Sequence, residues 1–459
     1  MKLVVLGGGG VRSPLLAKSL VANAKLINVD EIVFMDNDPE KLRIFGGLSK
    51  YVANAVDPDI HFWTTIDAED AVKDAHYVIT TLRVGQDESR YMDEKLAQKY
   101  NLVGQETTGI GGFAMSLRSI PALLEYCEMI GKLSDPSVLI FNFTNPSGLV
   151  TQALRTAGYD NVYGICDGPP HFIRTLERLL GVSHEEFDIT CYGLNHLSFY
   201  RDAKIKGRPV MDELLNHPDL YVKTDMRLFD KELVSILNHE LPNEYLYFFF
   251  YNDKVIRSIK EHGGARGELI RDINKRMIAE INRLDPQDQE RIFDVYIRHI
   301  IEREKSYFAI ESGKKRAEQF PIPTFQEFLD APNEGGYSAV ALEFIKAYHG
   351  GKKTVMPLIV PNNGAIPGLQ DDDVVEITCE IEKGVCRPRK IEDVPELQMH
   401  IIKTIKRFER LTVEAIHERN RLKAIEALMI HPLVNSYSLA TKLVDELLEM
   451  YKEYVGHWN

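Results

Sequence analysis

The first ten residues, MKLVVLGGGG, constrain the possible fold more than any other stretch of the chain. A short apolar run ends in four glycines, and the sequence SPLLAKSL follows shortly after them. The apolar run predicts a buried parallel strand, and the glycines predict a tight turn that leads into a helix. We expect Ser13 to be the N-cap of this helix and Pro14 to lie in its first turn. The free N–H groups at such a helix start attract a pyrophosphate.

A second apolar run, EIVFMD, ends in Asp36. An acid at the end of the second strand can accept hydrogen bonds from the ribose hydroxyls of NAD. The loop is not a full GxGxxG, because Ser13 takes the place of the third glycine, so a glycine-rich turn of an unrelated α/β domain is the alternative. The candidate cofactor-binding residues are Gly7, Gly8, Gly9, Val11, Arg12, Ser13 and Asp36.

Three more apolar runs, AHYVITTL, SVLIFNFT and NVYGIC, alternate with helical patterns in the first half of the chain. This alternation predicts an α/β fold with a doubly wound parallel sheet, whose ligands gather at the carboxyl ends of the strands. The segments after these runs are polar, although each one alone is also typical of a turn. Together they predict one crevice lined by Arg83, Gln86, Gln105, Glu106, Asn142, Asn145, Ser147, Cys166 and Asp167.

From about His196 onward, long helical patterns replace the alternation of strands and helices. The stretch PELQMHIIKTIKRFERLTVEAIHE is amphipathic, whereas TVMPLIVPNNGAI and DVVEITCEIEKG predict strands with a turn between them. We therefore expect two domains, a Rossmann-like NAD-binding domain at 1–195 and an α+β catalytic domain at 196–459.

Charge and cysteine content limit the partners and the location of the protein. The 459 residues include 55 Lys and Arg against 68 Asp and Glu, and the net charge of -13 does not attract nucleic acid or an anionic membrane. An anionic ligand therefore needs a local cationic pocket. The chain contains no apolar run long enough to span a bilayer, and its start is too short for a signal peptide. Five cysteines, an odd number, indicate reduced thiols and a cytoplasmic protein.

Taken together, the motifs resemble one known family. With the glycine loop, the sequences LRVGQ, GQETTGIGG, NFTNPSG, GICDGP, YGLNH, LPNEYLYFFF and PNNGAI occur in the order and spacing of glycoside hydrolase family four, as far as about Leu433. The resemblance implies an enzyme with a lactate/malate dehydrogenase-like architecture that uses NAD+ and a divalent metal, commonly Mn2+, to break glycosidic bonds. It also implies a homodimer or homotetramer.

The resemblance assigns roles to particular residues. Cys166 and His196 match the metal ligands, although a cysteine alone is more often a small buried hydrophobe and a thiolate alone favours softer metals than manganese. In the family, substrate hydroxyls and water fill the remaining coordination positions. Tyr245 matches the base, with Tyr247 and Tyr251 as close alternatives. Those implied to contact the substrate are Arg83, Asn145 and Arg266, and Asp167 matches an acid that assists the leaving group.

The family mechanism is an oxidation followed by an elimination. NAD+ takes a hydride from C3 of the sugar, which makes the proton at C2 acidic; a base removes that proton, and the leaving group departs from C1. Water adds at C1 and the hydride returns to C3, so that NAD+ is regenerated. A tyrosine with the ordinary pKa of about 10 can act as this base near neutral pH only if a cation stabilises its phenolate.

Two signals disagree on the anomer. Asp167, beside Cys166, is typical of 6-phospho-α-glucosidases, but Gly168 departs from the usual apolar residue there. The sequences LRVGQ, NFTNPSG, IKRFERLTVEAI and HPLV are more similar to 6-phospho-β-glucosidases. We therefore expect hydrolysis of 6-phospho-β-glucosides such as cellobiose 6-phosphate, with a 6-phospho-α-glucosidase as the alternative. More distant alternatives are an NAD-dependent 2-hydroxy acid dehydrogenase and a non-catalytic sensor of NAD or a phosphosugar.

Overall fold

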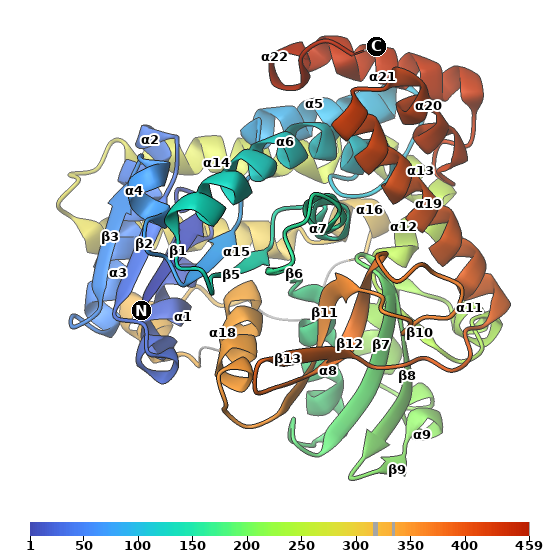
Figure 1. Cartoon of the computed structure of the whole chain (residues 1–459), viewed down its shortest axis with the longest axis horizontal. Helices are drawn as coiled ribbons and strands as arrows, with labels where there is room; N and C mark the ends of the chain where they lie inside the picture. Colours follow the sequence, from blue (N-terminus) through green and yellow to red (C-terminus); the bar gives the residue numbers. More distant parts are fainter. Residues whose placement is uncertain (315–319, 333–335, 459) are drawn as a thin grey trace.

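The computed structural model describes residues 1–314, 320–332 and 336–458. Within them the chain forms a nine-stranded sheet, in the order β13-β12-β11-β6-β5-β4-β1-β2-β3, and a smaller four-stranded sheet built on β10-β8-β7, with β9 paired to β8 (Figure 1). Helices pack against the larger sheet, among them α4 against β1 and β2, and α7 against β6 and β12. The doubly wound α/β architecture expected from the sequence is confirmed.

Six strands of the large sheet are parallel, and five of them come from the apolar runs identified in the sequence. The run HFWTT, which forms the sixth, was not predicted, because only one of its five side chains is fully buried and its apolar pattern is weak. The parallel strands are β1 Lys2–Leu6, β2 Glu31–Met35, β3 His61–Thr65, β4 Tyr77–Thr80, β5 Leu139–Asn142 and β6 Val162–Gly164.

The remaining strands of the large sheet come from much later in the chain. These are β11 Thr354–Pro361, β12 Val374–Glu382 and β13 Val385–Pro388, which pair antiparallel to one another. β11 also pairs antiparallel with β6, where Ile359 lies opposite Gly164. The two apolar runs of the C-terminal half are therefore strands, as predicted, and they extend the sheet that the first residues begin. The domain division at 195/196 stays a prediction.

The helix after the glycine loop begins at the expected place, but its cap differs from the prediction. α1 spans Ser13–Asn23, its N-cap is Arg12, and Pro14 lies in the first turn. Ser13 is already helical because the Arg12 carbonyl accepts the first helical hydrogen bond, from the Leu16 N–H at 3.1 Å. The Ser13 N–H itself donates to the Gly10 carbonyl at 2.9 Å. Ser13 is therefore a buried residue of the first turn, and the N-cap prediction was wrong by one position.

The other helices of the first half lie between the parallel strands along the chain, or after the last of them. They are α2 Pro39–Lys41, α3 Gly47–Val56, α4 Ala68–Val72, α5 Gln86–Lys99, α6 Gly109–Leu133, α7 Ser147–Thr156 and α8 Gly168–Leu180, with η1 Ala24–Ile27 and η2 Leu42–Gly46.

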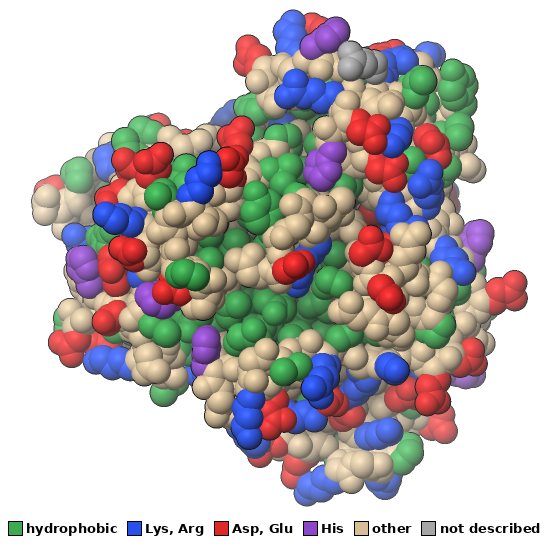
Figure 2. All heavy atoms as spheres, in the orientation of Figure 1, with side chains coloured by type: hydrophobic (Ala, Val, Ile, Leu, Met, Phe, Trp, Pro, Cys, Tyr) green, Lys and Arg blue, Asp and Glu red, His purple; other side chains and the backbone are tan. Residues whose placement is uncertain are grey.

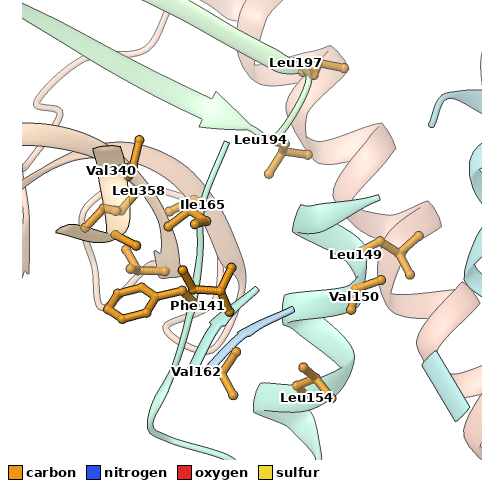
Figure 3. Packing of buried hydrophobic residues seen from close by; sticks show 14 of the residues in the cluster. Phe141, Leu149, Val150, Leu154, Val162, Ile165, Leu194, Leu197, Val340 and Leu358 are labelled. Carbon is orange, nitrogen blue, oxygen red and sulfur yellow. The ribbon is translucent and has the colours of Figure 1, made fainter. Parts of the chain in front are cut away.

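The small sheet is built on a β-hairpin whose tip carries a candidate metal ligand. β7 Phe187–Leu194 and β8 Leu197–Ile205 pair antiparallel, and Leu194 lies opposite Leu197, so Asn195 and His196 form a two-residue turn. β10 Leu241–Pro242 and β9 Arg208–Pro209 pair with β8. Leu194 and Leu197 are buried in the same apolar cluster as Leu149 of α7, as Figure 3 shows. The core thus anchors both ends of the turn.

The C-terminal half is mostly helical, as predicted. Its elements are α9 Met211–Leu215, α10 Leu220–Lys223, η3 Asp225–Leu228, α11 Lys231–Ile236, α12 Leu246–Phe250, α13 Asn252–His262, α14 Arg266–Ile281, α15 Gln289–Lys305, α16 Ala309–Ser312, α17 Phe325–Asp330, α18 Gly336–Tyr348, α19 Glu396–Glu418, α20 Arg421–Ile430, α21 Tyr437–Met450 and α22 Lys452–Val455. Helices α14 and α15 pack together, and Phe293 and Tyr296 of α15 join an apolar cluster with Phe45, next to α3. Among the helices of the described residues, we find none with the length and apolarity required to cross a membrane.

One face of the molecule has a large apolar hollow. Figure 2 shows hydrophobic side chains gathered near the centre of this face, with charged and histidine side chains around them. A groove of about 990 Å³ is lined by Ile173, Phe187, Val340 and Met356 together with residues of both charge signs. Its lining contains none of the predicted site residues, so within the described part of the chain this groove is separate from the predicted crevice.

A buried histidine joins the C-terminal helices to the rest of the core. His431 follows α20 and is 2% exposed, and its ring lies 4.7 Å from that of Phe408 in α19 and 5.9 Å from that of Phe249 in α12. Its Nδ1 accepts the Leu433 N–H at 3.2 Å. Burial lowers the pKa of His431 to about 3, because the charged imidazolium is poorly solvated in this position.

We predict that His431 makes the fold sensitive to acid. Below pH 6.5 the unfolded chain binds a proton at this residue whereas the folded chain does not, so stability falls as the pH drops from 6.5 towards 3. At pH 5.5 the loss is roughly 1 to 2 kcal/mol. In His431→Asn, whose side-chain oxygen can still accept the Leu433 N–H, we expect urea unfolding midpoints at pH 7.5 and 5.5 to differ less than in the wild type. An equal pH dependence in both proteins would contradict this.

Candidate functional site

The glycine loop and Asp36 form one compact unit at the end of the first two strands. Gly7 has a positive φ of 95°, and its N–H donates to the Met35 carbonyl at 2.9 Å. The Gly9 N–H donates to Asp36 Oδ2 at 2.9 Å, and the Asp38 N–H donates to Asp36 Oδ1 at 3.0 Å. Burial raises the pKa of Asp36, and these two backbone donors oppose that rise.

The close approach of Gly9 to Asp36 explains why this position has no side chain. A Cβ at Gly9 would lie 2.9 Å from Asp36 Oδ2 and 2.9 Å from its Cγ, closer than carbon atoms approach in proteins. The backbone of the loop is therefore bare on the side that faces the acid, which fits a loop that lies against a dinucleotide. Val11 points elsewhere, because it packs against the apolar cluster that joins α3 and α15.

The two candidate metal ligands meet, although they come from different sheets. Cys166 follows β6 of the large sheet, and His196 lies in the turn between β7 and β8. Cys166 Sγ and His196 Nε2 are 3.8 Å apart, and each residue is 9% exposed. A thiol and an imidazole nitrogen that face each other at this distance can share one ion. The donor set therefore fits a divalent metal.

Burial keeps both candidate ligands neutral in the protein alone. It raises the pKa of the Cys166 thiol well above its usual value, and the carboxylates of Glu376 and Asp167 raise it further. Burial also lowers the pKa of His196 to about 4, so its ring is an uncharged imidazole near neutral pH. An uncharged imidazole is the form that binds a metal, whereas the thiol must lose its proton on binding.

Within residues 1–314, 320–332 and 336–458, the pair is not part of a larger cluster of metal-binding side chains. Among the described residues there is no group of three or more His, Cys, Asp or Glu side chains arranged to hold a metal ion. The assignment of Cys166 and His196 as the metal ligands, with other oxygen donors completing the coordination, stays a prediction.

Tyr245 lies directly against the histidine of this pair. The two rings stack with their centroids 3.8 Å apart and their planes 4° from parallel. Tyr307 OH donates to Tyr245 OH at 3.4 Å and also lies 3.4 Å from Glu244 Oε1. Burial and the Glu244 carboxylate raise the pKa of Tyr245 above its usual value. Near neutral pH its phenol is therefore protonated unless a cation is added beside it.

Arg83 is already paired with an acid in the structure. Arg83 Nη1 lies 2.5 Å and Arg90 Nη1 3.1 Å from Glu106 Oε2. Burial alone would raise the pKa of Glu106, but the two guanidinium groups outweigh it and hold the pKa well below its usual range. Glu106 is therefore a fixed negative charge close to His196 and Tyr245. Its charge partly opposes the effect of burial on the pKa of His196 and adds to the rise in the pKa of Tyr245.

Three further arginines approach one another near Tyr245. Arg266, the first residue of α14, donates to the Arg303 carbonyl and to Ser306 Oγ, both at 3.3 Å, and its guanidinium lies 5.3 Å from the centre of the Tyr307 ring. Burial lowers the pKa of Arg303 to about 10, and the charges of Arg12 and Arg266 add to this effect. The carboxylates of Asp87 and Glu304 oppose this shift, so the three guanidinium groups form a candidate anion site that acids partly balance.

The glycine loop and the candidate acid are connected by Arg12. Its Nη2 lies 2.8 Å from Glu304 Oε1, and its Nη1 lies 3.6 Å from Asp167 Oδ2. Asp167 is the N-cap of α8 and its side chain is about one third exposed. The end of α15 therefore meets the cofactor loop and the residue after Cys166 at one place.

The other polar strand ends differ in their roles. Asn142 and Ser147 are buried and point inward: Thr80 donates to Asn142 Oδ1 at 2.8 Å, and Ser147 Oγ donates to the Asn142 carbonyl at 3.0 Å. They stabilise the loop after β5. Asn145 precedes Pro146 in this loop and is partly buried. Cys127, Cys191 and Cys379 are buried and Cys386 is partly buried, and all are free thiols.

Sequence reasoning missed Arg303, Tyr307 and Glu244. Arg303 and Tyr307 lie at the end of α15 and just beyond it, in a stretch without a recognisable motif, and they reach the site only through the packing of α14 on α15. Glu244 directly precedes Tyr245 in the sequence LPNEYLYFFF, and only this position beside the candidate base could have indicated that it lies in the site.

The fold and this site define an α/β protein that combines a dinucleotide-type glycine loop with a buried thiol–imidazole pair. A family model described as "Family 4 glycosyl hydrolase" matches residues 2–182, and one described as "Family 4 glycosyl hydrolase C-terminal domain" matches residues 191–434. The chain therefore belongs to family 4 of the glycosyl hydrolases, and the family expected from its motifs is confirmed.

Individual relatives match along nearly the whole chain. The sequence is 30% identical to the 6-phospho-beta-glucosidase BglT of Thermotoga maritima, with 99% of each chain covered. It is 26% identical to the maltose-6'-phosphate glucosidase MalH of Clostridium acetobutylicum, with 98% of each covered. A crystal structure of the Thermotoga maritima 6-phospho-beta glucosidase with manganese, NAD+ and glucose-6-phosphate is 30% identical, with a TM-score of 0.80 over 99% of both chains.

We predict that Gly9→Ala weakens the binding of NAD+. The added methyl group would displace the Asp36 carboxylate and break its hydrogen bond with the residue 9 N–H. Asp36 would then no longer be placed to accept hydrogen bonds from the ribose of NAD+, and losing one hydrogen bond to a charged group lowers affinity roughly tenfold. Titration calorimetry with NAD+ measures this, and Gly47→Ala in α3, where a Cβ meets nothing within 4 Å, is the matched control. Equal NAD+ affinities for Gly9→Ala and the wild type would contradict the role of the loop.

Proposed function

We propose that the protein hydrolyses 6-phospho-β-glucosides such as cellobiose 6-phosphate, with NAD+ and a divalent metal, Mn2+, as cofactors. The observation that carries the proposal is the pairing of Cys166 Sγ with His196 Nε2 at 3.8 Å, under the ring of Tyr245. This pair follows a strand of the same sheet whose first loop fits a dinucleotide. The bound cofactor and the metal would therefore share one crevice at the carboxyl ends of the strands.

The similar proteins support the substrate class. BglT of Thermotoga maritima is a 6-phospho-beta-glucosidase, and a solved structure of that enzyme contains manganese, NAD+ and glucose-6-phosphate. A probable 6-phospho-beta-glucosidase of Bacillus subtilis is also 29% identical over 99% of this chain. We extend these properties to the present chain as part of the proposal.

The side chains of the site fit an oxidation followed by an elimination. When bound, NAD+ would accept a hydride from C3 of the sugar, and the metal would act as a Lewis acid towards the oxygens at C2 and C3. Cys166 and His196 would hold that metal. Tyr245, stacked on His196, would remove the proton from C2. Because burial and the carboxylates of Glu244 and Glu106 raise the pKa of Tyr245, this role requires the positive charge of the ion beside the ring.

Asp167 would assist departure of the leaving group at C1. It is the residue after Cys166, its side chain is partly exposed, and Arg12 lies 3.6 Å away and holds it towards the glycine loop. Asn145, in the loop after β5, would hydrogen-bond hydroxyl groups of the sugar.

The substrate phosphate would bind near the start of α14. Arg266 donates to the Arg303 carbonyl there, and burial, together with the charges of Arg12 and Arg266, lowers the pKa of Arg303, so an anion beside it would stabilise its charged form. Guanidinium groups suit the paired oxygens of a phosphate. Arg83 contributes less charge than the sequence suggests, because Glu106 already pairs with it. In a protein with a net charge of -13, such a local pocket is needed to hold a phosphosugar.

A 6-phospho-α-glucosidase is the second candidate. Asp167 beside Cys166 favours it, and so does the likeness to the maltose-6'-phosphate glucosidase of Clostridium acetobutylicum. A 2-hydroxy acid dehydrogenase is less well supported, because such an enzyme needs no thiol–imidazole metal pair.

We also propose a cytoplasmic homodimer or homotetramer with its domain boundary near residue 195, and the apolar groove beside Phe187 and Val340 supports self-association.

We predict that the enzyme cleaves p-nitrophenyl 6-phospho-β-glucoside in the presence of Mn2+ and NAD+ without net formation of NADH. The hydride returns to the sugar in each turnover, so absorbance should rise from nitrophenol alone. The same assay should be run with a panel of α- and β-linked glucosides and galactosides, each with and without the 6-phosphate. Preference for the α-linked compound would select the second candidate, and NADH accumulating in proportion to product would contradict the proposed cycle.

We predict that Tyr245→Phe removes the base and leaves the fold intact. General bases contribute roughly 100- to 10,000-fold to rate, so kcat should fall by that order while the Kd for NAD+ stays unchanged. The variant should also lose solvent exchange at C2 of a substrate that carries deuterium there. Tyr247→Phe, which alters the tyrosine stacked on Tyr251, tests the alternative base. If Tyr247→Phe abolishes the exchange and Tyr245→Phe does not, the assignment is wrong.

A further inference from the structure

A buried polar chain lies behind His196, on the side of the ring opposite Cys166. Nδ1 of His196 is 3.0 Å from Thr107 Oγ1, and Thr107 in turn contacts Gln105. All three side chains are nearly inaccessible, at 9%, 9% and 7% exposed. Thr107 and Gln105 belong to the loop that precedes α6, and neither has a role in the reaction described above.

The orientation of the Gln105 side chain follows from its contact with the backbone. The Thr107 N–H lies 2.6 Å from one terminal atom of the Gln105 amide. A backbone N–H can only donate, so the atom that faces it must be the carbonyl oxygen Oε1 and not the NH₂ group. This contact therefore fixes which end of the amide points towards Thr107.

The orientation of the Thr107 hydroxyl follows in turn. Its Oγ1 lies 2.9 Å from the same Oε1 atom, which can only accept. The hydroxyl must therefore use its single hydrogen in this bond. What remains on Oγ1 are lone pairs, so towards His196 Nδ1 the hydroxyl is an acceptor. Nδ1 must then carry the imidazole hydrogen, which leaves Nε2 with a free lone pair facing Cys166 Sγ at 3.8 Å.

We propose that Gln105 and Thr107 are positioning residues that hold His196 in the Nδ1–H tautomer and so make Nε2 available to the metal. The inference rests on the proposed function, because it takes His196 as a metal ligand. In the opposite tautomer the hydrogen on Nε2 would point at the position of the ion and block it. A hydrogen bond to the distal ring nitrogen is the usual way in which proteins set the tautomer and angle of a metal-binding histidine.

Close packing holds both the loop that carries Thr107 and the hairpin turn that carries His196. On the loop side, a Cβ at Gly111 of α6 would lie 2.0 Å from the Gln105 carbonyl oxygen, so the loop rests directly on the first turn of the helix. On the hairpin side, Asn195 Oδ1 accepts the Gly148 N–H at 3.2 Å, and its Nδ2 donates to Glu376 Oε1 at 3.0 Å. The buried Leu194 and Leu197 flank the turn (Figure 3).

The backbone of His196 shows that the surroundings determine its position. Its φ is +63°, a left-handed conformation that a residue with a side chain adopts at a cost and keeps only when neighbouring contacts enforce it. Ser198 Oγ donates to Glu376 Oε2 at 2.8 Å and so ties the other side of the turn to β12. These contacts hold the turn, and with it the His196 backbone, against β12 and α7.

Metal binding by full-length variants tests the proposal. Thr107→Val keeps the shape of the side chain but removes its hydroxyl, whereas Thr107→Ser retains the hydroxyl. We expect Thr107→Val to bind Mn2+ roughly 10- to 100-fold more weakly than the wild type, as measured by the electron paramagnetic resonance signal of free Mn2+. Thr107→Ser should stay within about threefold, and NAD+ affinity should be unchanged in both. Wild-type Mn2+ affinity in a folded Thr107→Val would overturn the proposal.

Two additional variants separate this inference from the proposed function. Cys166→Ser and His196→Ala should both lose Mn2+ binding while circular dichroism shows an unchanged fold. If both variants bind Mn2+ like the wild type, the metal site itself is wrong. If they lose the metal but Thr107→Val does not, the site stands and only the role of Thr107 and Gln105 fails.

The wild-type protein gives a second, independent measurement. Long-range ¹H–¹⁵N correlations of the metal-free protein labelled with ¹⁵N-histidine report which ring nitrogen carries the hydrogen, and the signal missing in His196→Ala identifies the residue. We expect the hydrogen on Nδ1. A hydrogen on Nε2 would overturn the proposal even if Thr107→Val failed to fold.

Discussion

The approach of a thiol to an imidazole from two separate sheets is the constraint on which the rest of the structure depends. Cys166 follows β6 of the large sheet, and His196 sits at the tip of a hairpin of the small one. β12 connects them, because it belongs to the large sheet, packs against β7, and carries Glu376, which accepts hydrogen bonds from both Asn195 and Ser198. A shift between the sheets would separate the two candidate ligands.

The electrostatics of the site are arranged for an added cation. Burial and nearby carboxylates raise the pKa of Cys166 and of Tyr245, so both groups hold their protons in the protein alone. A single divalent ion beside them would reverse both effects at once, since it stabilises thiolate and phenolate together. In the proposed function, the acidic surroundings of this pair would serve the metal and the guanidinium groups around Arg303 would serve the phosphate.

Local patterns predicted what depends on neighbours in the sequence, and missed what depends on folding. The runs before Gly7 and Asp36 identified strands and their polar ends, because apolar periodicity and turn residues are local signals. The closeness of Cys166 and His196 came only with the family resemblance, since no spacing rule joins two sheets. Arg303 and Tyr307 reach the site through helix packing and carried no signal. The cap at Ser13 failed by one residue because a turn at Gly10 tightens the helix start.

The late return of β11, β12 and β13 to the first sheet has a consequence for synthesis of the chain. β6 is complete at Gly164, but the strand that covers its outer edge begins only at Thr354. While the intervening residues leave the ribosome, that edge is an unpaired template for other strands. Until these later strands are made, the large sheet of the nascent protein is incomplete. Its hazard is edge-to-edge aggregation during translation, which chaperone access to the β6 edge would reduce.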